Sequence, residues 1–371
     1  MKLYEYMGKE LFAKYGIRVP RGRVVASAEE AETAAAELGP PVVLKAQVLV
    51  GGRGKAGAVR FADSPKEARA AAAEMLGREI KGCRVERVLI EEKLQIDREL
   101  YLSVAVDGGA RRPVLLASAH GGVDIEEVPE DRLVRYHVDP TIGVLPYVGR
   151  EITRRLGLTG NVAREVQRII PTMYRIFCEK DAELVEINPL VVCGEEVLAA
   201  DAKVTVDDEA LFRQKDLPFV EERTEIERRA HELGLSYVEL DGNISVMANG
   251  AGMTMATLDL IQAYGGRPAN FLDAGGGTGE EATAQALELL LATGPRAIFI
   301  NIFGGITRCD DVARAFVRVK ESREIPVPVV IRLVGTNEEQ ALAILRAAGI
   351  EAFRNMEEAA RKAVELAGGE G

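Results

Sequence analysis

The sequence predicts two α/β domains in tandem: a mixed α/β domain over residues 1–237 and a doubly wound parallel sheet over residues 238–371. Three observations predict this fold class. Strand and helix patterns do not alternate strictly in the first part, whereas they alternate regularly after residue 241. A glycine-rich loop, Gly51–Gly57, separates two strand patterns of the first part. The length of 371 residues is enough to bury more than one core.

The elements of the first domain follow from hydrophobic periodicity and capping signals. Apolar residues recur at helical spacing up to Gly16, and Ser27 and Ser64 each begin a capping box. We expect helices over residues 3–15, 27–38, 64 onward, 162–178 and 221–233, with Pro171 interrupting or kinking the fourth. We expect strands over residues 42–46, 58–62, 85–91, 100–106, 113–118, 182–187 and 197–200.

The second domain has four apolar strands separated by helical patterns. These strands cover residues 244–248, 269–272, 297–302 and 328–333. Glycine-rich turns after the first three, at Asn249–Gly252, Asp273–Gly277 and Gly304–Gly305, fall where open α/β sheets bind ligands. Each turn by itself is equally typical of a tight βα connection. Three turns at one sheet edge favour an anion site.

The composition excludes several functional classes. A net charge of −11 argues against nucleic acid as the main partner. No apolar run approaches the ~18 residues of a membrane span. Scattered cysteines without a C-x-x-C pair are typical of reduced thiols, and the first residues resemble neither a secretory nor a transit signal. We therefore expect a cytoplasmic protein.

The glycine loop matches two nucleotide-binding patterns, and its context separates them. Gly52, Gly54 and Gly57 fit G-x-G-x-x-G, but a strand pattern follows where a dinucleotide fold needs a helix. A Walker A loop is excluded because Ala56 stands where Ser or Thr is required. A loop between two strands, beside Lys45, is typical of a grip on a polyphosphate. A flexible hairpin tip is the plain structural alternative.

Two polar residues at strand ends predict a metal site beside this loop. Asn188 follows one strand and Asp201 follows the next. Amide and carboxylate oxygens suit Mg²⁺, whose other ligands are waters and phosphates. An Asn-Pro turn and a strand-end Asp are also common in structural roles. The phosphate loop makes the metal interpretation the better one.

Motifs distributed along the whole chain resemble one family. They include residues 11–16, 51–57, 186–190, 210–214, 240–244, 249–252, 268–273 and 301–306. Together these stretches resemble the β subunits of succinate–CoA ligases of the ADP-forming type. The resemblance implies an N-terminal ATP-grasp domain followed by a flavodoxin-like CoA-ligase domain.

The resemblance also implies roles for residues of both domains. Nucleotide contacts are implied for Lys45, Gly52, Arg53, Gly54, Glu91, Leu94 and Glu99. Asn188 and Asp201 would bind Mg²⁺, and Glu186 would be the catalytic residue that faces a phosphohistidine. Carboxylate substrate would be bound by Asn249, Gly305, Ile306 and Thr307. Leu49 and Leu94 depart from the family pattern, and Leu94 leaves ATP/ADP or GTP/GDP open.

The chain lacks the histidine through which the family passes phosphate. None of His120, His137 and His231 lies in a suitable glycine-rich segment. The resemblance therefore implies an α subunit that carries the phosphohistidine and binds most of the CoA, in an αβ or α₂β₂ assembly. Succinate would be the substrate.

Three alternatives remain open from the sequence. A malate–CoA ligase β subunit shares this fold and chemistry, and Thr307 offers a partner for an added hydroxyl. A non-catalytic nucleotide-binding subunit predicts loss of Lys45, Asn188 or Asp201, all of which are present. A self-sufficient ATP-grasp ligase does not explain the three glycine loops after residue 240.

Overall fold

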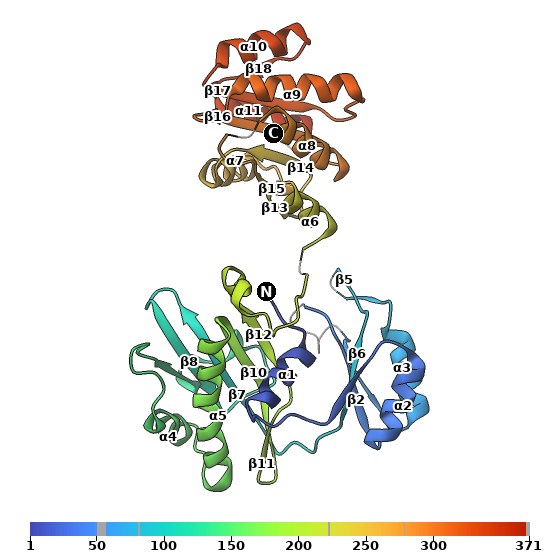
Figure 1. Cartoon of the computed structure of the whole chain (residues 1–371), viewed down its shortest axis with the longest axis vertical. Coiled ribbons are helices and arrows are strands. Elements are labelled where there is room, and N and C mark those ends of the chain that lie inside the picture. Colours follow the sequence, from blue (N-terminus) through green and yellow to red (C-terminus); the bar gives the residue numbers. More distant parts are fainter. Residues whose placement is uncertain (50–56, 81, 222, 278, 369–371) are drawn as a thin grey trace. The chain divides into compact units, whose positions relative to one another are not determined.

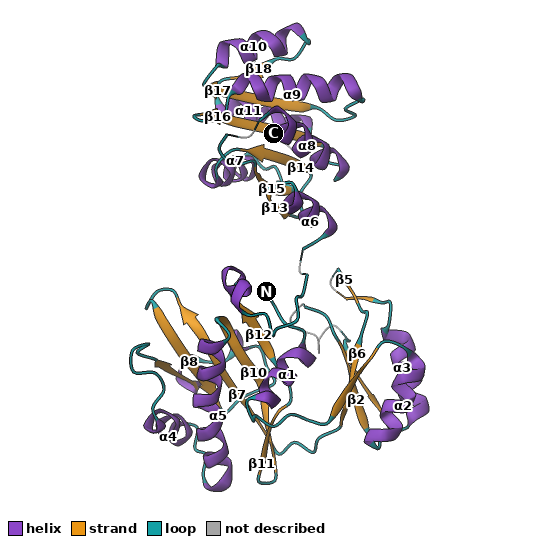
Figure 2. Ribbon diagram, in the orientation of Figure 1, coloured by secondary structure: helices purple, strands orange, loops and turns teal. Residues whose placement is uncertain are grey.

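The computed structural model describes residues 1–49, 57–80, 82–221, 223–277 and 279–368. The chain divides into two compact units, Met1–Glu222 and Arg223–Gly371. Each unit contains both helices and strands (Figures 1 and 2). Within the described ranges, we find no helix that combines the length and the hydropathy needed to cross a membrane.

The first unit contains a four-stranded antiparallel sheet with the order β1-β6-β2-β3. Its strands are β1 (Gly22–Val25), β2 (Val42–Ala46), β3 (Val59–Ala62) and β6 (Val88–Glu92). Helices α2 (Ala28–Leu38) and α3 (Pro65–Met75) lie side by side next to it (Figure 1). Ser27 and Ser64 cap them by accepting from Glu30 N and Glu67 N, as the sequence predicts.

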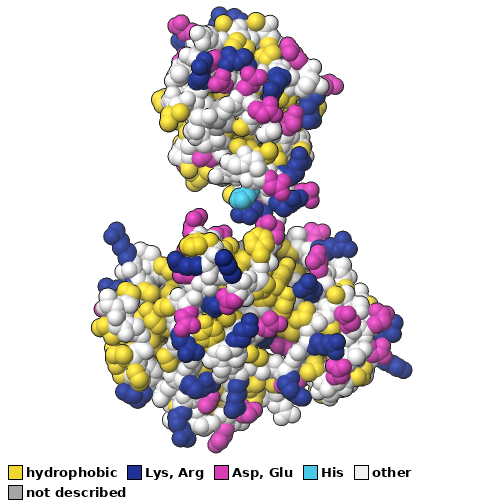
Figure 3. All heavy atoms as spheres, in the orientation of Figure 1, with side chains coloured by type: hydrophobic (Ala, Val, Ile, Leu, Met, Phe, Trp, Pro, Cys, Tyr) yellow, Lys and Arg dark blue, Asp and Glu magenta, His cyan; other side chains and the backbone are white. Residues whose placement is uncertain are grey.

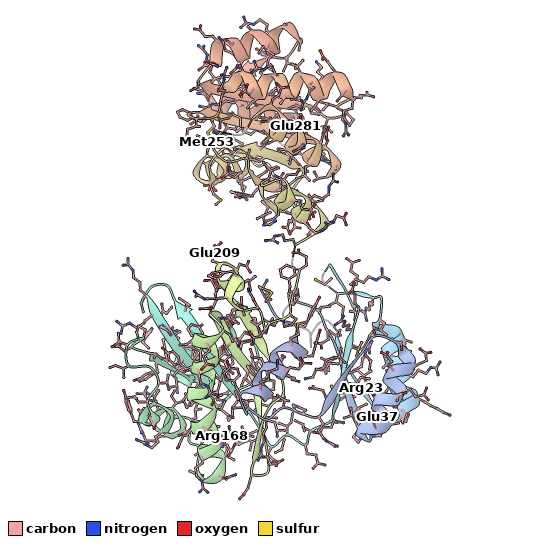
Figure 4. The ribbon with its side chains drawn as sticks, in the orientation of Figure 1. Arg23, Glu37, Arg168, Glu209, Met253 and Glu281 are labelled. Carbon is pink, nitrogen blue, oxygen red and sulfur yellow. The ribbon has the colours of Figure 1, made fainter. Side chains whose placement is uncertain are left out.

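Two smaller features complete this part of the unit. A short hairpin pairs β4 (Glu79–Ile80) with β5 (Cys83–Arg84). Arg23 and Glu37, labelled in Figure 4, form a 3.0 Å ion pair between β1 and the end of α2.

The two strands expected on either side of the glycine loop are confirmed, because β2 and β3 are antiparallel neighbours with Lys45 opposite Val59.

The second sheet of this unit has six strands in the order β11-β10-β7-β8-β9, with β12 also paired to β10. They are β7 (Arg98–Asp107), β8 (Arg112–Ser118), β9 (Leu133–His137), β10 (Ala182–Cys193), β11 (Glu196–Ala199) and β12 (Lys203–Val206). Helices α4 (Pro146–Arg155) and α5 (Gly160–Glu179) accompany the sheet, with 3-10 turns at Ile125–Glu127, Glu130–Arg132 and Asp208–Arg213. Pro171 was predicted to interrupt or kink this helix, and the interruption is wrong, since α5 continues through Pro171.

Helix α1 (Glu5–Lys14) contacts both sheets. Its N-terminal side is fixed by a hydrogen bond from Leu3 N to Val204 O beside β12. Its C-terminal end is fixed by Arg168 of α5, labelled in Figure 4, which donates to Gly16 O at 2.9 Å. The helix is therefore held over the space between the two sheets.

The second unit is a six-stranded sheet with the order β13-β15-β14-β16-β17-β18. Its strands are β13 (Ser236–Glu239), β14 (Ile244–Ala248), β15 (Asn270–Asp273), β16 (Ala297–Gly304), β17 (Val329–Gly335) and β18 (Ala352–Phe353). All pairs are parallel except β13 with β15. The five parallel strands follow the flavodoxin-like order 2-1-3-4-5, which confirms the doubly wound prediction.

Helices cover both faces of this second sheet. They are α6 (Glu225–Glu232), α7 (Ala251–Ala263), α8 (Glu280–Ala292), α9 (Cys309–Ser322), α10 (Glu338–Ala347) and α11 (Met356–Leu366). One apolar core contains residues of α8, α9 and α10, and a second contains residues of α7 and α11. The two cores use opposite sides of the strands, as in β16, where Ile298 and Ile300 belong to one and Ala297 and Phe299 to the other.

Residues 223–237 belong to the second compact unit, whereas the sequence interpretation included them in a first domain of residues 1–237. Strand β13 pairs antiparallel with β15, and Ala230 of α6 is buried in the core that α8 and α9 share. Helix α6, which the sequence interpretation took as a connector, is therefore packed within the second unit, because Ala230, its one buried residue, belongs to a core of that unit.

Candidate nucleotide cleft and switch-point loops

A cleft of about 830 Å³ lies between the two sheets of the first unit. Six of the residues predicted for the site line it: Lys45, Glu91, Leu94, Glu186, Asn188 and Asp201. Gly52, Arg53 and Gly54 lie outside the described residues. Glu99 is exposed on β7 and is not among the cleft-lining residues that the structure describes. Most of the predicted set is thus brought together, although its members are up to 156 positions apart in the sequence (201 − 45).

Lys45 projects from β2 into the cleft, where it donates two hydrogen bonds and forms an ion pair with a third partner. Its Nζ lies 2.9 Å from Glu5 Oε1, 2.9 Å from Glu91 Oε2 and 2.6 Å from Ala200 O. Burial opposes the charge of this ammonium, but the neighbouring carboxylates of Glu5, Glu91 and Asp201 outweigh it and raise the pKa of Lys45. Lys45 is therefore a permanent cation at the base of the cleft.

Glu186 lies on β10 opposite Lys203 of β12 and accepts a 3.0 Å hydrogen bond from the hydroxyl of Tyr101. Burial raises the pKa of Glu186, helped by the nearby charges of Asp201 and Glu126 and opposed by Lys203 and Tyr101. A half-buried carboxyl with a raised pKa is suited to exchanging a proton or to accepting from an imidazole.

Asn188 lies on β10 and Asp201 lies in the connection between β11 and β12, and both line the same cleft. Asn188 holds a neighbouring loop: its Oδ1 accepts from Gly122 N at 2.8 Å, and its Nδ2 donates to Val123 O at 2.9 Å. Asp201 Oδ1 accepts from Ala202 N at 2.7 Å. An amide oxygen and a carboxylate are ligand types that suit a hard cation such as Mg²⁺.

The far end of the cleft is apolar. Val43, Phe61, Leu94 and Ile96 line it, with Lys93 Nζ 5.1 Å from the centre of the Phe61 ring. The Phe61 side chain is 62% exposed although it faces the cleft. An apolar wall with an open aromatic face is suited to a flat heterocycle.

In the second unit, the predicted substrate residues lie at the switch point of the sheet, between β14 and β16. Asn249 follows β14 and joins the two strand ends: its Nδ2 donates to Phe303 O and its Oδ1 accepts from Phe303 N, both at 2.8 Å. Thr307 is buried and accepts from Gly277 N at 3.1 Å, which ties in the loop after β15. Gly305 and Ile306 are exposed just before α9 begins.

Comparison with known proteins decides the family. An ATP-grasp domain model matches residues 2–192, and a CoA-ligase model matches residues 247–366. The β subunit of the ADP-forming succinate–CoA ligase of Rubrobacter xylanophilus is 50% identical, over 99% of each chain. The chain belongs to the succinate–CoA ligase β-subunit family. The corresponding subunit of Methanothermobacter thermautotrophicus is 48% identical, also over 99% of each chain.

Solved structures agree on the fold. The ATP citrate lyase of Methanothrix soehngenii, in complex with citrate and coenzyme A, superposes with a TM-score of 0.74 at 22% identity. The match covers 98% of this chain and 99% of that one. The fold of this succinate–CoA ligase family member is thus shared with an experimentally solved structure.

Sequence reasoning missed several polar residues that line or support the cleft. Glu5 and Lys9 of α1 lie 2.9 Å apart and are buried beside Lys45 and Glu91. Tyr101 supports Glu186 from β7, and residues 122–127 form one wall of the cleft. The spacing of Glu5 and Lys9 places both on one helix face, but the spacing alone does not tell a buried face from a solvated one.

Proposed function

We propose that this chain is the nucleotide-binding β subunit of an ADP-forming succinate–CoA ligase, which works with an α subunit that carries a phosphohistidine. The overall reaction is ATP + succinate + CoA ⇌ succinyl-CoA + ADP + phosphate. The observation that carries the proposal is the single cleft that gathers Lys45, Glu91, Glu186, Asn188 and Asp201. The similarity to full-length β subunits supports the same assignment.

Within the cleft, we assign each residue by its chemistry. Lys45 neutralises phosphate oxygens, with Gly52, Arg53 and Gly54 completing the grip, and the apolar end beside Leu94 receives the base. Glu99 would reach the ribose only at the margin of the cleft. Asn188 and Asp201 would hold Mg²⁺, which neutralises phosphate charge when it is bound with the nucleotide.

Glu186 acts at the far side of the phosphates. Its carboxylate accepts from the imidazole N–H of the α-subunit histidine, and so directs the opposite ring nitrogen at the terminal phosphorus. That nitrogen forms a bond to phosphorus as the bond from phosphorus to the bridging oxygen of ADP breaks. Tyr101 fixes the orientation of the carboxylate.

The switch-point loops of the second unit receive the smaller anions. Asn249, Gly305, Ile306 and Thr307 would bind the carboxylate substrate, because backbone N–H groups at a helix start attract anions. CoA is bound mainly by the α subunit.

The test is to co-express the chain with its α partner and to assay thioester formation. Succinate, malate and citrate are compared, each with ATP and with GTP. We expect succinate and ATP to give the highest kcat/KM. Preference for malate or citrate contradicts the substrate assignment, and robust activity of this chain without α contradicts the two-subunit proposal.

A further inference from the structure

The N-terminal helix places two buried charges against the phosphate-facing lysine. Lys9 Nζ lies 2.9 Å from Glu5 Oε1 and 2.5 Å from Glu91 Oε1. Glu5, Lys9 and Glu91 are only 2%, 4% and 2% exposed. With Lys45 they form a ring of four alternating charges, because each carboxylate bridges both ammonium groups. The ring is neutral as a whole, with two cations and two anions.

This ring, together with one backbone carbonyl, surrounds the ammonium group of Lys45 with oxygen partners. Lys45 donates to Glu5 Oε1 and to the carbonyl of Ala200, and it forms an ion pair with Glu91 Oε2. A phosphate oxygen that approaches Lys45 must therefore replace one of these acceptors. A carboxylate that loses Lys45 stays buried, and an unpaired buried charge is costly.

The backbone is shaped to allow this ring. A Cβ at Gly8 would lie 2.9 Å from Ala202 Cβ, so glycine lets α1 approach the segment that follows Asp201. A Cβ at Gly22 would lie 2.8 Å from Glu91 Cγ, so glycine on β1 leaves room for the Glu91 side chain. Three separate segments, α1, β2 and β6, thus meet at one ionic cluster.

We infer that Lys9 is a positioning residue that releases Lys45 to the polyphosphate. Lys9 keeps the Glu5 and Glu91 carboxylates neutralised while Lys45 exchanges one of them for a phosphate oxygen. The inference rests on the proposed function, since it takes the cleft as a nucleoside polyphosphate site. Lys9 itself touches no reacting atom.

The inference predicts opposite effects for the two α1 residues. In Lys9→Met, Lys45 is the only ammonium group of the ring left to neutralise the two carboxylates. Lys45 therefore binds them more tightly, and the affinity for MgADP falls. Glu5→Gln removes one competitor for Lys45, so MgADP affinity rises. The double variant Glu5→Gln/Lys9→Met restores a neutral cluster and returns affinity toward wild type. Each single change is expected to shift Kd by about ten-fold, the scale of one charge interaction at partly buried sites.

The experiment is calorimetric titration of the full chain with MgADP, beginning with the wild type. Lys180→Met is the matched control, because Lys180 is a largely buried lysine of the same unit, paired with Asp216 at 2.7 Å. Its removal should leave Kd unchanged. Thermal unfolding of every variant measures the purely structural cost.

Opposite shifts in Kd for Lys9→Met and Glu5→Gln support the inference. Shifts of the same sign, or an unchanged Kd in Lys9→Met, overturn it, because a merely structural cluster loses affinity in both. If Lys9→Met fails to fold, Glu5→Gln decides: tighter binding supports the inference, and equal or weaker binding overturns it. A wild type that does not bind MgADP refutes the proposed function, and the inference falls with it.

Discussion

The candidate sites of the two units differ in how far they depend on buried side-chain charge. In the first unit, buried side-chain charges of both signs surround the cleft, including Lys45, Glu91 and Asp201. In the second unit, the neutral side chains of Asn249 and Thr307 join the loops, and one carboxylate, Asp273, accepts from Gly250 N and Gly275 N. Surface composition does not explain the contrast, because Figure 3 shows side chains of both signs interspersed on the visible face of each unit.

The contrast corresponds to the ligands that we propose. A nucleoside polyphosphate with its metal carries several charges, and full-charge partners are needed to remove it from water. A small carboxylate or a single phosphoryl group is held by backbone N–H groups and a helix dipole. These groups carry only partial charges, so the protein does not have to bury a full charge of its own. The first site should therefore respond steeply to changes of charge, and the second to loss of loop geometry.

The largest effect is expected for Asp201→Ala, which removes the carboxylate proposed to hold Mg²⁺. Loss of metal-assisted charge neutralisation costs several kcal/mol, so phosphorylation of the α subunit by ATP should fall by about 100-fold or more. Incorporation of labelled phosphate into the α subunit measures this. Glu196→Ala is the control: it removes the exposed ion pair between Glu196 at the start of β11 and Arg18, and it should leave phosphorylation of the α subunit unchanged. Unchanged phosphorylation in Asp201→Ala would remove this residue from the metal site.

Asn249→Ala tests the second site. It removes the two hydrogen bonds that hold Phe303 at the switch point, so the KM for succinate should rise about 10-fold or more, as expected for one to two lost bonds. MgADP affinity should stay within two-fold of wild type. Steady-state kinetics of the assembled enzyme and calorimetry of the chain make the two measurements.

A matched control separates loop geometry from stability in this test. Asn270 makes the same pair of bonds, to Val246 N and O at 3.0 and 2.8 Å, but inside the sheet. Asn270→Ala should lower the melting temperature at least as much without raising KM. If both variants raise KM equally, Asn249 acts through stability and not through the loops.

A smaller effect is expected for Phe61→Ala at the apolar end of the first cleft. Loss of the open ring should weaken MgADP binding by about five- to ten-fold, the worth of one aromatic stacking contact. Magnesium pyrophosphate, which has no base, should bind equally to both forms. Phe212→Ala is the matched control, since Phe212 is 72% exposed with Arg213 5.6 Å from its ring centre. Equal weakening for pyrophosphate would place Phe61 outside the base site.

Much of this architecture is predictable from the sequence, because it depends on local signals. Capping boxes located α2 and α3, and β2 was predicted with its observed bounds of Val42–Ala46. Alternation of strands and helices predicted the parallel sheet of the second unit. Asn188 and Asp201 were paired because each follows a predicted strand, and the structure brings both to one cleft.

The parts that escaped prediction depend on tertiary contacts. The buried residues of α1 are Glu5, Gly8, Lys9, Leu11 and Phe12, and a search for apolar residues does not find the two charged ones. A pair such as Glu5 and Lys9 normally indicates a solvated helix face. The Asn-Pro signal predicted a turn, whereas β10 continues through Asn188 and Pro189 because β7 pairs on both sides with a shifted register.

The smallest effect concerns an ionic cluster beside the second site. Asp310 is 2% exposed and accepts from Arg308 at 3.0 Å and from Asn337 at 2.8 Å, with Arg314 also 3.0 Å away. These donors hold the pKa of Asp310 well below its usual range, so its stabilising effect is present above the unfolded pKa and is lost as the pH falls.

Asp310→Asn should therefore lower the melting temperature at pH 7 by about 2–6 °C, and the difference from wild type should shrink as the pH falls below about 4. Thermal unfolding between pH 6 and pH 3 measures both quantities. MgADP affinity should not change, because this cluster fixes the start of α9 and the turn before α10, which lie in the other unit from the cleft. A melting difference that stays constant with pH would mean that Asp310 stabilises through shape, and the charged design would then be confined to the first unit.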